Sequence, residues 1–364
     1  MLEFFDSNIP VFGIGACVRV SGHIPDSLMQ RQSQLHAWLS SLWPDRQFSL
    51  APASADASFR SYHRVSFDDG SSVIVTDAPP AHEDCRPWLH VQKLFQAAGV
   101  HVPEVLAQDL TQGFLLLSDL GNTTYLSVLN AENASALYAD ALAALVNIQL
   151  ASRSGILPDY DRALLKREMD LFPEWFLACH HGLVLTDAER ATLEQTFECI
   201  LAVNLAEPQV FVHRDYHSRN LMVTTLNPGI IDFQDAVYGP ISYDLVSLFK
   251  DAYVEWDEEQ MLDWLIRYWE MARKAGVPVR ADFAEFHRDY EWMGVQRHLK
   301  VLGIFARLYH RDGKDGYLKD LPLVARYLRK ACERYTELGF LRRLLDRVEN
   351  KQTVLGYTIE RPAA

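Results

Sequence analysis

Residues that could hold a metal ion gather in two neighbouring stretches, "VFVHRDYHSRNLMV" (210–223) and "GIIDFQDAVYGPISYDL" (229–245). Asp215 and Asn220 are five residues apart, and Asp232 follows twelve residues later. Two carboxylates and one amide oxygen form a hard ligand set, which suits Mg²⁺ that carries the phosphates of a substrate. Because polar groups are costly to bury between apolar runs, we expect these residues to have a chemical role.

Short strands and turns must position these side chains. The run "QVFVH" predicts a strand ending at His213, "LMV" a strand after Asn220, and "GIID" a strand ending at Asp232. The polar groups then lie on the turns between the strands. A loop followed by a hairpin can bring Asp215, Asn220 and Asp232 close together, although Asp and Asn are also common as plain turn formers.

The surrounding pattern predicts an α+β protein with a small strand-rich lobe and a larger helical lobe. Helices are expected over 29–43 and 83–98, and two strands separated by the turn "DDG" predict a hairpin. Two more strands are expected in "VHVPEVLAQDL" and "FLLLSDLG", and helices from Thr123 onward, with 133–152 and 164–183 the clearest. We therefore divide the chain into an extension of unknown role (1–28), an N-lobe (29–119) and a C-lobe (120–364).

Composition limits the possible functions. The 364 residues carry a formal charge of −13, which makes a broad nucleic-acid-binding surface improbable, so we expect no nucleic-acid partner. The five cysteines show no CxxC spacing and fit free thiols in a reducing compartment. With no export signal and no apolar run long enough to span a membrane, we expect a cytoplasmic protein without a membrane partner.

The central motif carries a resemblance to a known family. The stretch "HRDYHSRN" with "IDF" resembles the H-x-D-x-x-x-x-N plus D-F signature of the protein-kinase-like phosphotransferases. His217 brings it closest to the branch of aminoglycoside phosphotransferases and choline kinases. Within that branch, "SADASFRSYHRV", "APPAHEDCRPW", "KREMDLFPEWF" and "QRHLKVLGIFARL" are similar to bacterial kinases of the anomeric hydroxyl of N-acetylmuramate and N-acetylglucosamine. The resemblance extends from residue 29 to about residue 350.

The resemblance implies a bilobal protein-kinase-like fold that uses ATP and Mg²⁺ on a small-molecule amino sugar. Asp215 would be the catalytic base, and Asn220 and Asp232 would hold the metal ion. The backbone of Ser118, Asp119 and Leu120 would meet the adenine. His213 is expected to brace the loop, and Asp244 matches the structural aspartate of the family.

The acceptor site is expected in two stretches of the helical lobe. Carboxylates can accept hydrogen bonds from sugar hydroxyls, and an aromatic side chain can pack beneath the ring. Lys300 and Arg307 share a helical face with Gln296, and a stripe exposed to solvent is the alternative interpretation of that face. The predicted acceptor residues are Glu168, Glu174, Trp175, His217, Lys300 and Arg307.

The sequence also departs from the family pattern. Thr76 stands near the place where relatives have a phosphate-binding lysine, and "SADASFRS" lacks the glycines typical of a loop that covers phosphates. Arg60 or Arg64 could supply the missing charge, and Arg60 is taken as a nucleotide contact. Two other functions stay open, a kinase of aminoglycosides or other small alcohols and a pseudokinase that only binds a nucleotide. The sequence distinguishes neither ATP from GTP nor one amino sugar from the other.

Overall fold

The computed structural model describes residues 26–54 and 60–349 of the chain. The chain divides into two compact units, Met1–Ser49 with Ser66–Ser71, and Leu50–Val65 with Ser72–Ala364. The predicted extension, residues 1–28, lies outside the described residues except for its last three. The predicted lobe boundary at residue 119 falls inside the second unit.

The first unit consists of helix α1 (Asp26–Leu42) and a small aromatic cluster, which confirms the helix expected at 29–43. Trp43 meets Phe67 edge to face, with ring centroids 4.8 Å apart. The Arg46 guanidinium lies 3.6 Å from the centroid of Phe67 and forms a 2.5 Å ion pair with Asp69. These contacts join the end of α1 to the turn at residues 66–71.

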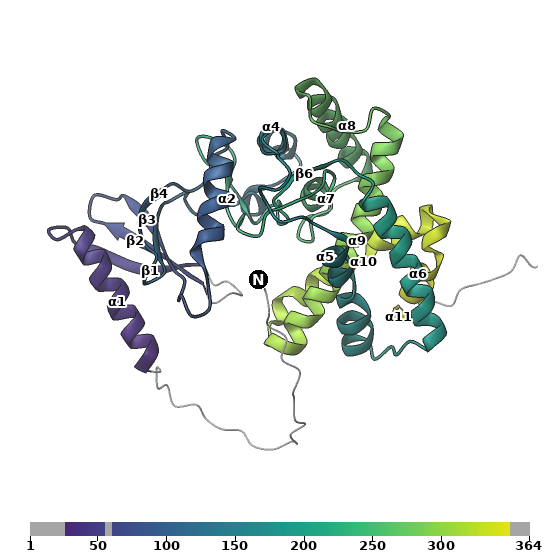
Figure 1. Cartoon of the computed structure of the whole chain (residues 1–364), viewed down its shortest axis with the longest axis horizontal. Helices are drawn as coiled ribbons and strands as arrows, with labels where there is room; N and C mark the ends of the chain where they lie inside the picture. Colours follow the sequence, from purple (N-terminus) through teal and green to yellow (C-terminus); the bar gives the residue numbers. More distant parts are fainter. Residues whose placement is uncertain (1–25, 55–59, 350–364) are drawn as a thin grey trace, which may run out of the picture. The chain divides into compact units, whose positions relative to one another are not determined.

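Five strands form an antiparallel sheet in the order β1-β2-β3-β5-β4. They are β1 (Phe48–Ser54), β2 (Ser61–Phe67), β3 (Ser72–Asp77), β4 (Val105–Asp109) and β5 (Phe114–Ser118). Helix α2 (Cys85–Ala97) begins at Asp84, whose carboxylate accepts from the Arg86 N–H, and its apolar side packs beside the strands (Figure 1). The hairpin, the helix and all the strands expected here are confirmed.

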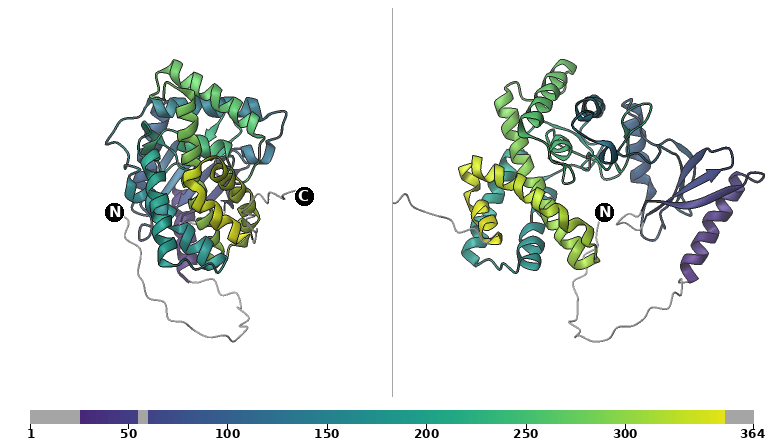
Figure 2. Two further views of the ribbon diagram at one scale, coloured as in Figure 1. Left: turned by 90° about the vertical axis from the view of Figure 1, so that its right-hand side faces the viewer. Right: turned by 180° about the vertical axis from the view of Figure 1, so that it is seen from behind.

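The remainder of the second unit is mainly helical. Its helices are α3 (Tyr125–Val128), α4 (Ala134–Leu150), α5 (Arg162–Met169), η1 (Phe172–His180), α6 (Asp187–Asn204), α7 (Tyr243–Phe249), α8 (Glu258–Ala275), α9 (Phe283–Asp312), η2 (Asp315–Asp320), α10 (Leu321–Arg334), η3 (Thr336–Leu338) and α11 (Gly339–Val348). Helix α9 is the central one, with α10 packed beside it (light green and yellow in Figure 2). A Cβ on Gly303 would lie 2.5 Å from Leu171, so a glycine is needed where α9 meets the start of η1.

The helix expected at 164–183 is confirmed as helical but changes type along its length. The α-helix α5 ends at Met169, and η1 is a π-helix that begins at Phe172. Pro173 cannot donate a backbone hydrogen bond and disfavours a regular α-helical turn, which explains the change. Such π-helical segments occur frequently at functional sites.

Four short strands carry the central motif. They are β6 (Gln209–Val212), β7 (Leu221–Met222), β8 (Gly229–Ile230) and β9 (Val237–Pro240). β6 pairs with β9 and β7 with β8, both antiparallel. The strands expected around the motif are therefore present, although β6 ends at Val212, one residue before His213, and β8 ends at Ile230, two residues before Asp232.

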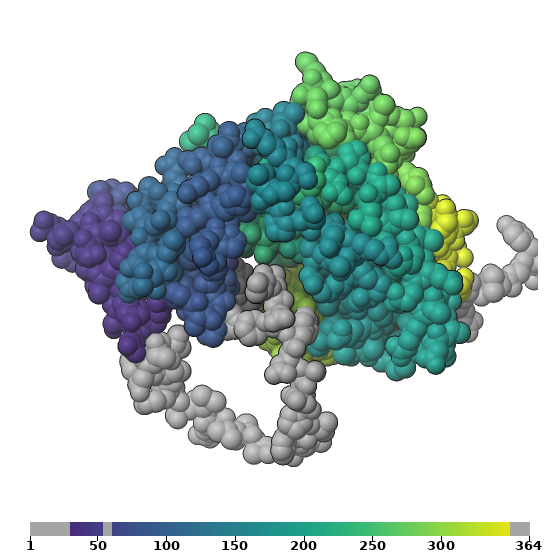
Figure 3. Space-filling view, in the orientation of Figure 1, coloured from purple at the N-terminus to yellow at the C-terminus, as the bar shows by residue number. Residues whose placement is uncertain are grey.

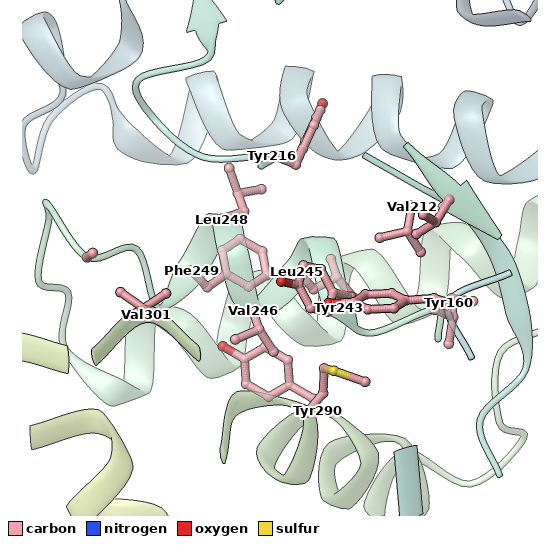
Figure 4. Packing of buried hydrophobic residues seen from close by; sticks show 14 of the residues in the cluster. Tyr160, Val212, Tyr216, Tyr243, Leu245, Val246, Leu248, Phe249, Tyr290 and Val301 are labelled. Atoms are coloured by element: carbon pink, nitrogen blue, oxygen red, sulfur yellow. The ribbon is translucent and has the colours of Figure 1, made fainter. Parts of the chain in front are cut away.

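One hydrophobic cluster runs from Ala78 to Leu345 and joins the strands and helices of the second unit. The space-filling view shows the blue and teal segments of this unit in contact (Figure 3). Tyr160 and Tyr243 meet at 5.2 Å at the centre of the close-up, beneath the end of β6 (Figure 4). None of the described helices is long and apolar enough to cross a membrane. No disulfide bond joins the described cysteines, which are Cys85, Cys179, Cys199 and Cys332, and Cys17 lies outside the described residues.

Candidate active site

The loop between β6 and β7, residues 213–220, is braced by a buried histidine as expected. His213 Nε2 donates to the carbonyl of Ile231 at 3.0 Å, and Nδ1 accepts from the backbone N–H of Asp215 at 3.2 Å. Because one ring nitrogen donates and the other accepts, His213 is held as a neutral imidazole. Burial agrees with this state, because it lowers the pKa of His213 to about 4.

Asp244 at the start of α7 holds the turn that presents Asp215. Its two carboxylate oxygens accept from the backbone N–H groups of His213 (2.7 Å) and Arg214 (3.0 Å). Arg214 has φ = 77°, a conformation that costs a residue with a side chain about 1–3 kcal/mol and persists when its surroundings enforce it. Burial raises the pKa of Asp244 to about 7. The geometry therefore supports the structural role expected for Asp244.

Asn220 and Asp232 come together as the spacing predicted. Asn220 Nδ2 lies 3.2 Å from Asp232 Oδ2 and donates to the backbone carbonyl of Asp215 at 3.0 Å. Gln234 Nε2 donates to Asp232 Oδ1 at 2.7 Å. Asp232 itself has φ = 64°, a second strained residue at the same place. Structure and spacing thus agree on the geometry, while the metal role stays a prediction.

This pair fits Mg²⁺ better than a transition metal. Within residues 26–54 and 60–349, no group of three His, Cys, Asp or Glu residues is placed to hold a metal ion. Mg²⁺ needs no such group, because it takes one or two protein oxygens and completes its shell with water and substrate phosphates. One carboxylate beside one amide is a donor set of that kind.

Asp215 lies half-buried among cationic side chains. Burial opposes its ionisation, but the positive charges of Lys300, Arg297 and Arg214 outweigh that effect and lower the pKa of Asp215 to about 2. The carboxylate is therefore ionised at neutral pH. In that state it can accept a hydrogen bond from a hydroxyl group and orient it.

Glu168 and Lys300 form a buried ion pair beneath this loop. Lys300 Nζ lies 3.0 Å from Glu168 Oε1, and Arg214 Nη2 lies 2.5 Å from the same oxygen. Tyr160 donates to the other oxygen, Oε2, which also accepts from Gln296. Burial would raise the pKa of Glu168, but the neighbouring cations lower it.

This network contradicts a solvent-exposed stripe at Lys300. Gln296 and Lys300 are buried because α9 is the central helix at this level. Both charged groups, Glu168 and Lys300, are occupied with protein partners. The contacts favour positioning of the Arg214–Asp215 turn, while direct contact with the acceptor stays a prediction for both residues.

The other predicted acceptor residues lie on η1, on α9 and on the loop of residues 213–220. Glu174 is exposed and Trp175 is partly buried against the core. Arg307 is half-buried, and burial together with Arg311 lowers its pKa, while Glu174 acts in the opposite direction. His217 meets the Tyr253 ring edge to face at 5.6 Å. Their acceptor roles stay predictions.

A cavity of about 340 Å³ lies beside the Asn220–Asp232 pair. This volume is within the usual range for a small-molecule site. Of the predicted site residues, Ser118, Asp119, Leu120, Asn220 and Asp232 line it. Other described lining residues are Tyr62, Arg64, Ile74, Trp88, Asn122, Thr124, Arg219 and Phe233.

The β3 side of the cavity lacks the lysine of the family pattern. Ile74 lines the cavity, and Thr76 lies two residues further on the same face of β3, with a buried hydroxyl that has no partner among the described residues. Helix α2 contains no acidic residue, and Trp88 on its inner side packs at 5.1 Å from Phe233. The lysine and an acidic partner for it are thus both absent here.

The two arginines considered as substitutes for the lysine are both in ion pairs. Arg64 donates to Asp119 from Nε at 2.5 Å and from Nη2 at 2.9 Å. Burial opposes ionisation of Asp119, but the bonds from Arg64 and Ser72 lower its pKa. Arg60 pairs with Glu83 at 3.2 Å and is not among the described lining residues. Its nucleotide contact stays a prediction, and the loop at 55–59 lies outside the described residues.

Three contributions escaped the sequence argument. Arg64 joins Asp119 across 55 positions, which no local pattern reveals. Gln234 follows the "IDF" motif and holds Asp232. Arg219 lines the cavity, and its position directly before Asn220 in "HSRN" was the available signal.

Comparisons with known proteins agree with this geometry. A family model described as "Phosphotransferase enzyme family" matches residues 49–281. The chain is 52% identical to the N-acetylmuramate/N-acetylglucosamine kinase of Neisseria meningitidis serogroup B, covering 91% of this chain and 100% of that protein. It is 49% identical to the protein of that name from Pseudomonas putida, covering 86% of this chain and 96% of the relative.

Solved structures support the fold. The ADP-bound aminoglycoside phosphotransferase APH(2'')-Ib has a TM-score of 0.55 at 15% identity, covering 80% of this chain and 96% of that one. At this identity the likeness concerns the fold alone. The expected kinase-like α+β fold is confirmed.

Proposed function

The chain belongs to the phosphotransferase enzyme family and is a sugar kinase, and on this premise we propose that it uses ATP and Mg²⁺ to phosphorylate the anomeric hydroxyl of N-acetylmuramate, N-acetylglucosamine or both. The observation that carries the reaction is the approach of Asn220 and Asp232 beside Asp215 at the edge of the cavity. The observation that carries the acceptor is the 52% identity that extends over the full length of the Neisseria relative.

Asp215 orients the attacking hydroxyl in this proposal. The hydroxyl oxygen forms a bond to the γ-phosphorus, the bond between that phosphorus and the β–γ bridging oxygen breaks, and ADP leaves with the bond electrons. The hydroxyl proton passes to Asp215. A pKa of about 2 makes Asp215 a weak base, so orientation is its main contribution, and the proton moves late in a loose transition state.

An anomeric hydroxyl suits such a site. It is more acidic than an ordinary alcohol, so a weakly basic carboxylate can accept its proton more readily. Asn220 and Asp232 would hold Mg²⁺, which supplies neutralisation of phosphate charge when bound. The cations around Asp215 keep it ionised and ready to accept a hydrogen bond.

An acceptor panel with γ-labelled ATP tests the proposal. The panel contains N-acetylmuramate, N-acetylglucosamine, the methyl glycoside of N-acetylglucosamine, an aminoglycoside and choline. The methyl glycoside is the matched control, because it keeps every ring substituent but has no free anomeric hydroxyl. We expect label on one or both free amino sugars and none on the glycoside.

The position of the phosphate is read by NMR coupling between phosphorus and the anomeric proton. Label on the methyl glycoside, or phosphate on another ring oxygen, would refute the anomeric site. Phosphorylation of the aminoglycoside or choline, with neither amino sugar phosphorylated, would show that the acceptor is not an amino sugar of this kind. Nucleotide binding without turnover of any acceptor would favour a pseudokinase.

A further inference from the structure

Arg219 is a cationic residue in the lining of the cavity. Its side chain is half-buried and lines the cavity together with Asn220 and Asp232. The guanidinium carbon lies 3.6 Å from the centroid of the Tyr253 ring and 5.9 Å from that of Tyr317. An arginine packed on aromatic faces is held in a defined orientation but keeps its full charge.

The surroundings of Arg219 differ from those of the other arginine in the cavity lining. Arg64 is bound through two bonds to the carboxylate of Asp119. In the part of the chain that the structure describes, no salt bridge joins Arg219 to a carboxylate. An acidic residue within its electrostatic influence is Asp320, whose pKa burial raises and the charges of Lys319 and Arg219 lower. A half-buried arginine in the lining of a cavity is complementary to an anionic ligand.

Tyr253, on which Arg219 packs, is connected by hydrogen bonds to the loop of residues 213–220. The backbone N–H of Tyr253 donates to Asp251 Oδ1 at 3.1 Å, and the other oxygen of Asp251 accepts from the backbone N–H of Ser218 at 3.0 Å. Tyr253 also meets His217 edge to face. Hydrogen bonds therefore connect Tyr253, on which Arg219 packs, to the loop that carries Asp215, which keeps the cation positioned before a ligand arrives.

The other cations considered for this site have protein partners. Thr76 stands where the family has a lysine, Arg60 pairs with Glu83, and the charge of Lys300 is balanced by Glu168. The triphosphate of ATP is strongly anionic, and N-acetylmuramate adds a carboxylate that N-acetylglucosamine lacks. Each of these groups offers two oxygens that match the donor pair of a guanidinium.

We propose that Arg219 is an anion-binding residue of the active cavity and binds an oxyanion of a substrate, either a phosphate of the nucleotide or the carboxylate of the acid sugar. This inference rests on the proposed function for the identity of both substrates. The bond formed is a charge-assisted hydrogen-bonded pair between the guanidinium and two oxygens of the anion. Tyr253 orients the guanidinium for it.

Two pairs of ligands distinguish the two anions. The nucleotide pair is ATP and adenosine, whose dissociation constants are measured by calorimetry without an acceptor. The acceptor pair is N-acetylmuramate and N-acetylglucosamine, for which kcat/KM is measured at saturating ATP. Each pair shares one framework and differs in the anionic group.

We expect Arg219→Ala to lower the affinity for ATP, the kcat/KM for N-acetylmuramate, or both, roughly 10- to 100-fold. The same quantities for adenosine and N-acetylglucosamine should not change. Loss for ATP identifies a phosphate as the ligand, and loss for N-acetylmuramate identifies the carboxylate. Arg219→Lys should retain part of the affinity, because it keeps the charge but not the planar donor pair. Tyr253→Leu should show a smaller loss for the same ligand.

Arg267→Ala is the matched control, because Arg267 is an exposed arginine on α8 that pairs with Asp263. It removes the same charge from the protein without touching the cavity. Circular dichroism and thermal unfolding check that each variant is folded. Equal losses for charged and neutral ligands, or no loss in either pair, would overturn the role of Arg219.

The nucleotide arm also separates this inference from the proposed function. The proposed function is refuted if the wild-type protein phosphorylates neither sugar. The ATP-binding measurement needs no acceptor, so it still tests the role of Arg219 in that case. In that case, unchanged ATP binding in Arg219→Ala overturns the inference as well. Selective loss of ATP binding in Arg219→Ala would sustain it.

Discussion

The loop of residues 213–220 and the β3 side of the cavity differ in how their charged groups are arranged. Asp215 and Asn220 on the loop of residues 213–220 meet Asp232, which follows β8, and buried partners such as His213 and Asp244 hold the backbone in place. On the β3 side, Thr76 stands near the place where the family pattern has a lysine, and Trp88 of α2 lines the cavity. Among the described residues of this side, the cation that lines the cavity, Arg64, is paired with Asp119.

The difference indicates which part of the site tolerates change. In the proposed reaction, groups that bond to the reacting atoms must occupy fixed positions, which agrees with the buried supports of this loop. A cation that only balances the charge of a phosphate can lie on any side of it, because electrostatic attraction depends on distance and not on bond direction. Arg219 on the loop side is a candidate for that charge.

The largest effect is expected from Asp232→Ala. This variant removes the carboxylate proposed to hold Mg²⁺ and should lower kcat by about 10³-fold or more, since the phosphate charge is poorly neutralised. Turnover is measured over a range of Mg²⁺ concentrations. Asp235→Ala, which removes an exposed carboxylate from the same loop, is the control and should remain active. An unchanged rate and Mg²⁺ dependence in Asp232→Ala would mean that the metal is held elsewhere.

Asp215→Asn should have the next largest effect. It keeps the size of the side chain but removes the charge, so kcat should fall roughly 10²- to 10⁴-fold. Calorimetry should give an unchanged affinity for ATP, because Asp215 is not among the described residues that line the cavity. Near-wild-type turnover would remove Asp215 from the chemistry.

A smaller effect on rate but a clear effect on stability is expected from Lys300→Met. It leaves Glu168 buried with one cation fewer and should lower the free energy of unfolding by about 3–5 kcal/mol. Adding Glu168→Gln to the variant removes the uncompensated charge and should restore part of that loss. Denaturant unfolding of the two single variants and the double variant gives the coupling between the residues.

Lys300→Met should also change the pH dependence of the reaction. Lys300 is the largest of the charges that lower the pKa of Asp215, so its removal raises that pKa from about 2 towards the ordinary value. Asp215 acts as the ionised form, which exists above its pKa, so the acid limb of kcat/KM should move to higher pH. The shift should be the same for both sugars, since Lys300 acts through Asp215. A selective loss for N-acetylmuramate would instead place Lys300 at the acceptor.

The smallest effect is expected on the β3 side. Thr76→Val removes a buried hydroxyl that has no partner among the described residues, so stability should stay the same or rise by about 1 kcal/mol. The affinity for ATP should not change. A marked loss of ATP affinity in this variant would show that Thr76 contacts the phosphates, and that the β3 side still takes part in nucleotide binding.

Local sequence patterns were sufficient for most elements. The turn "DDG" and the apolar runs on either side of it indicated two strands of the sheet, and the pattern at 83–98 indicated α2. These signals are local, because turns, caps and periodicity depend on neighbours in the chain. The change from α5 to the π-helix η1 was missed, because Pro173 signals a disturbance but not which helical form follows.

For the site, the sequence by itself determined which polar groups come together, since residue types and short spacings decide which side chains a loop and the following hairpin can bring close. Asp215, Asn220 and Asp232 were found in this way. Only the tertiary structure decided which charges remain available to a substrate. Lys300 meets Glu168 across 132 positions and Arg64 meets Asp119 across 55, whereas Arg219 rests on a tyrosine. A cation is neutralised by whichever carboxylate folding brings next to it, and contacts at that separation leave no periodic trace in the sequence.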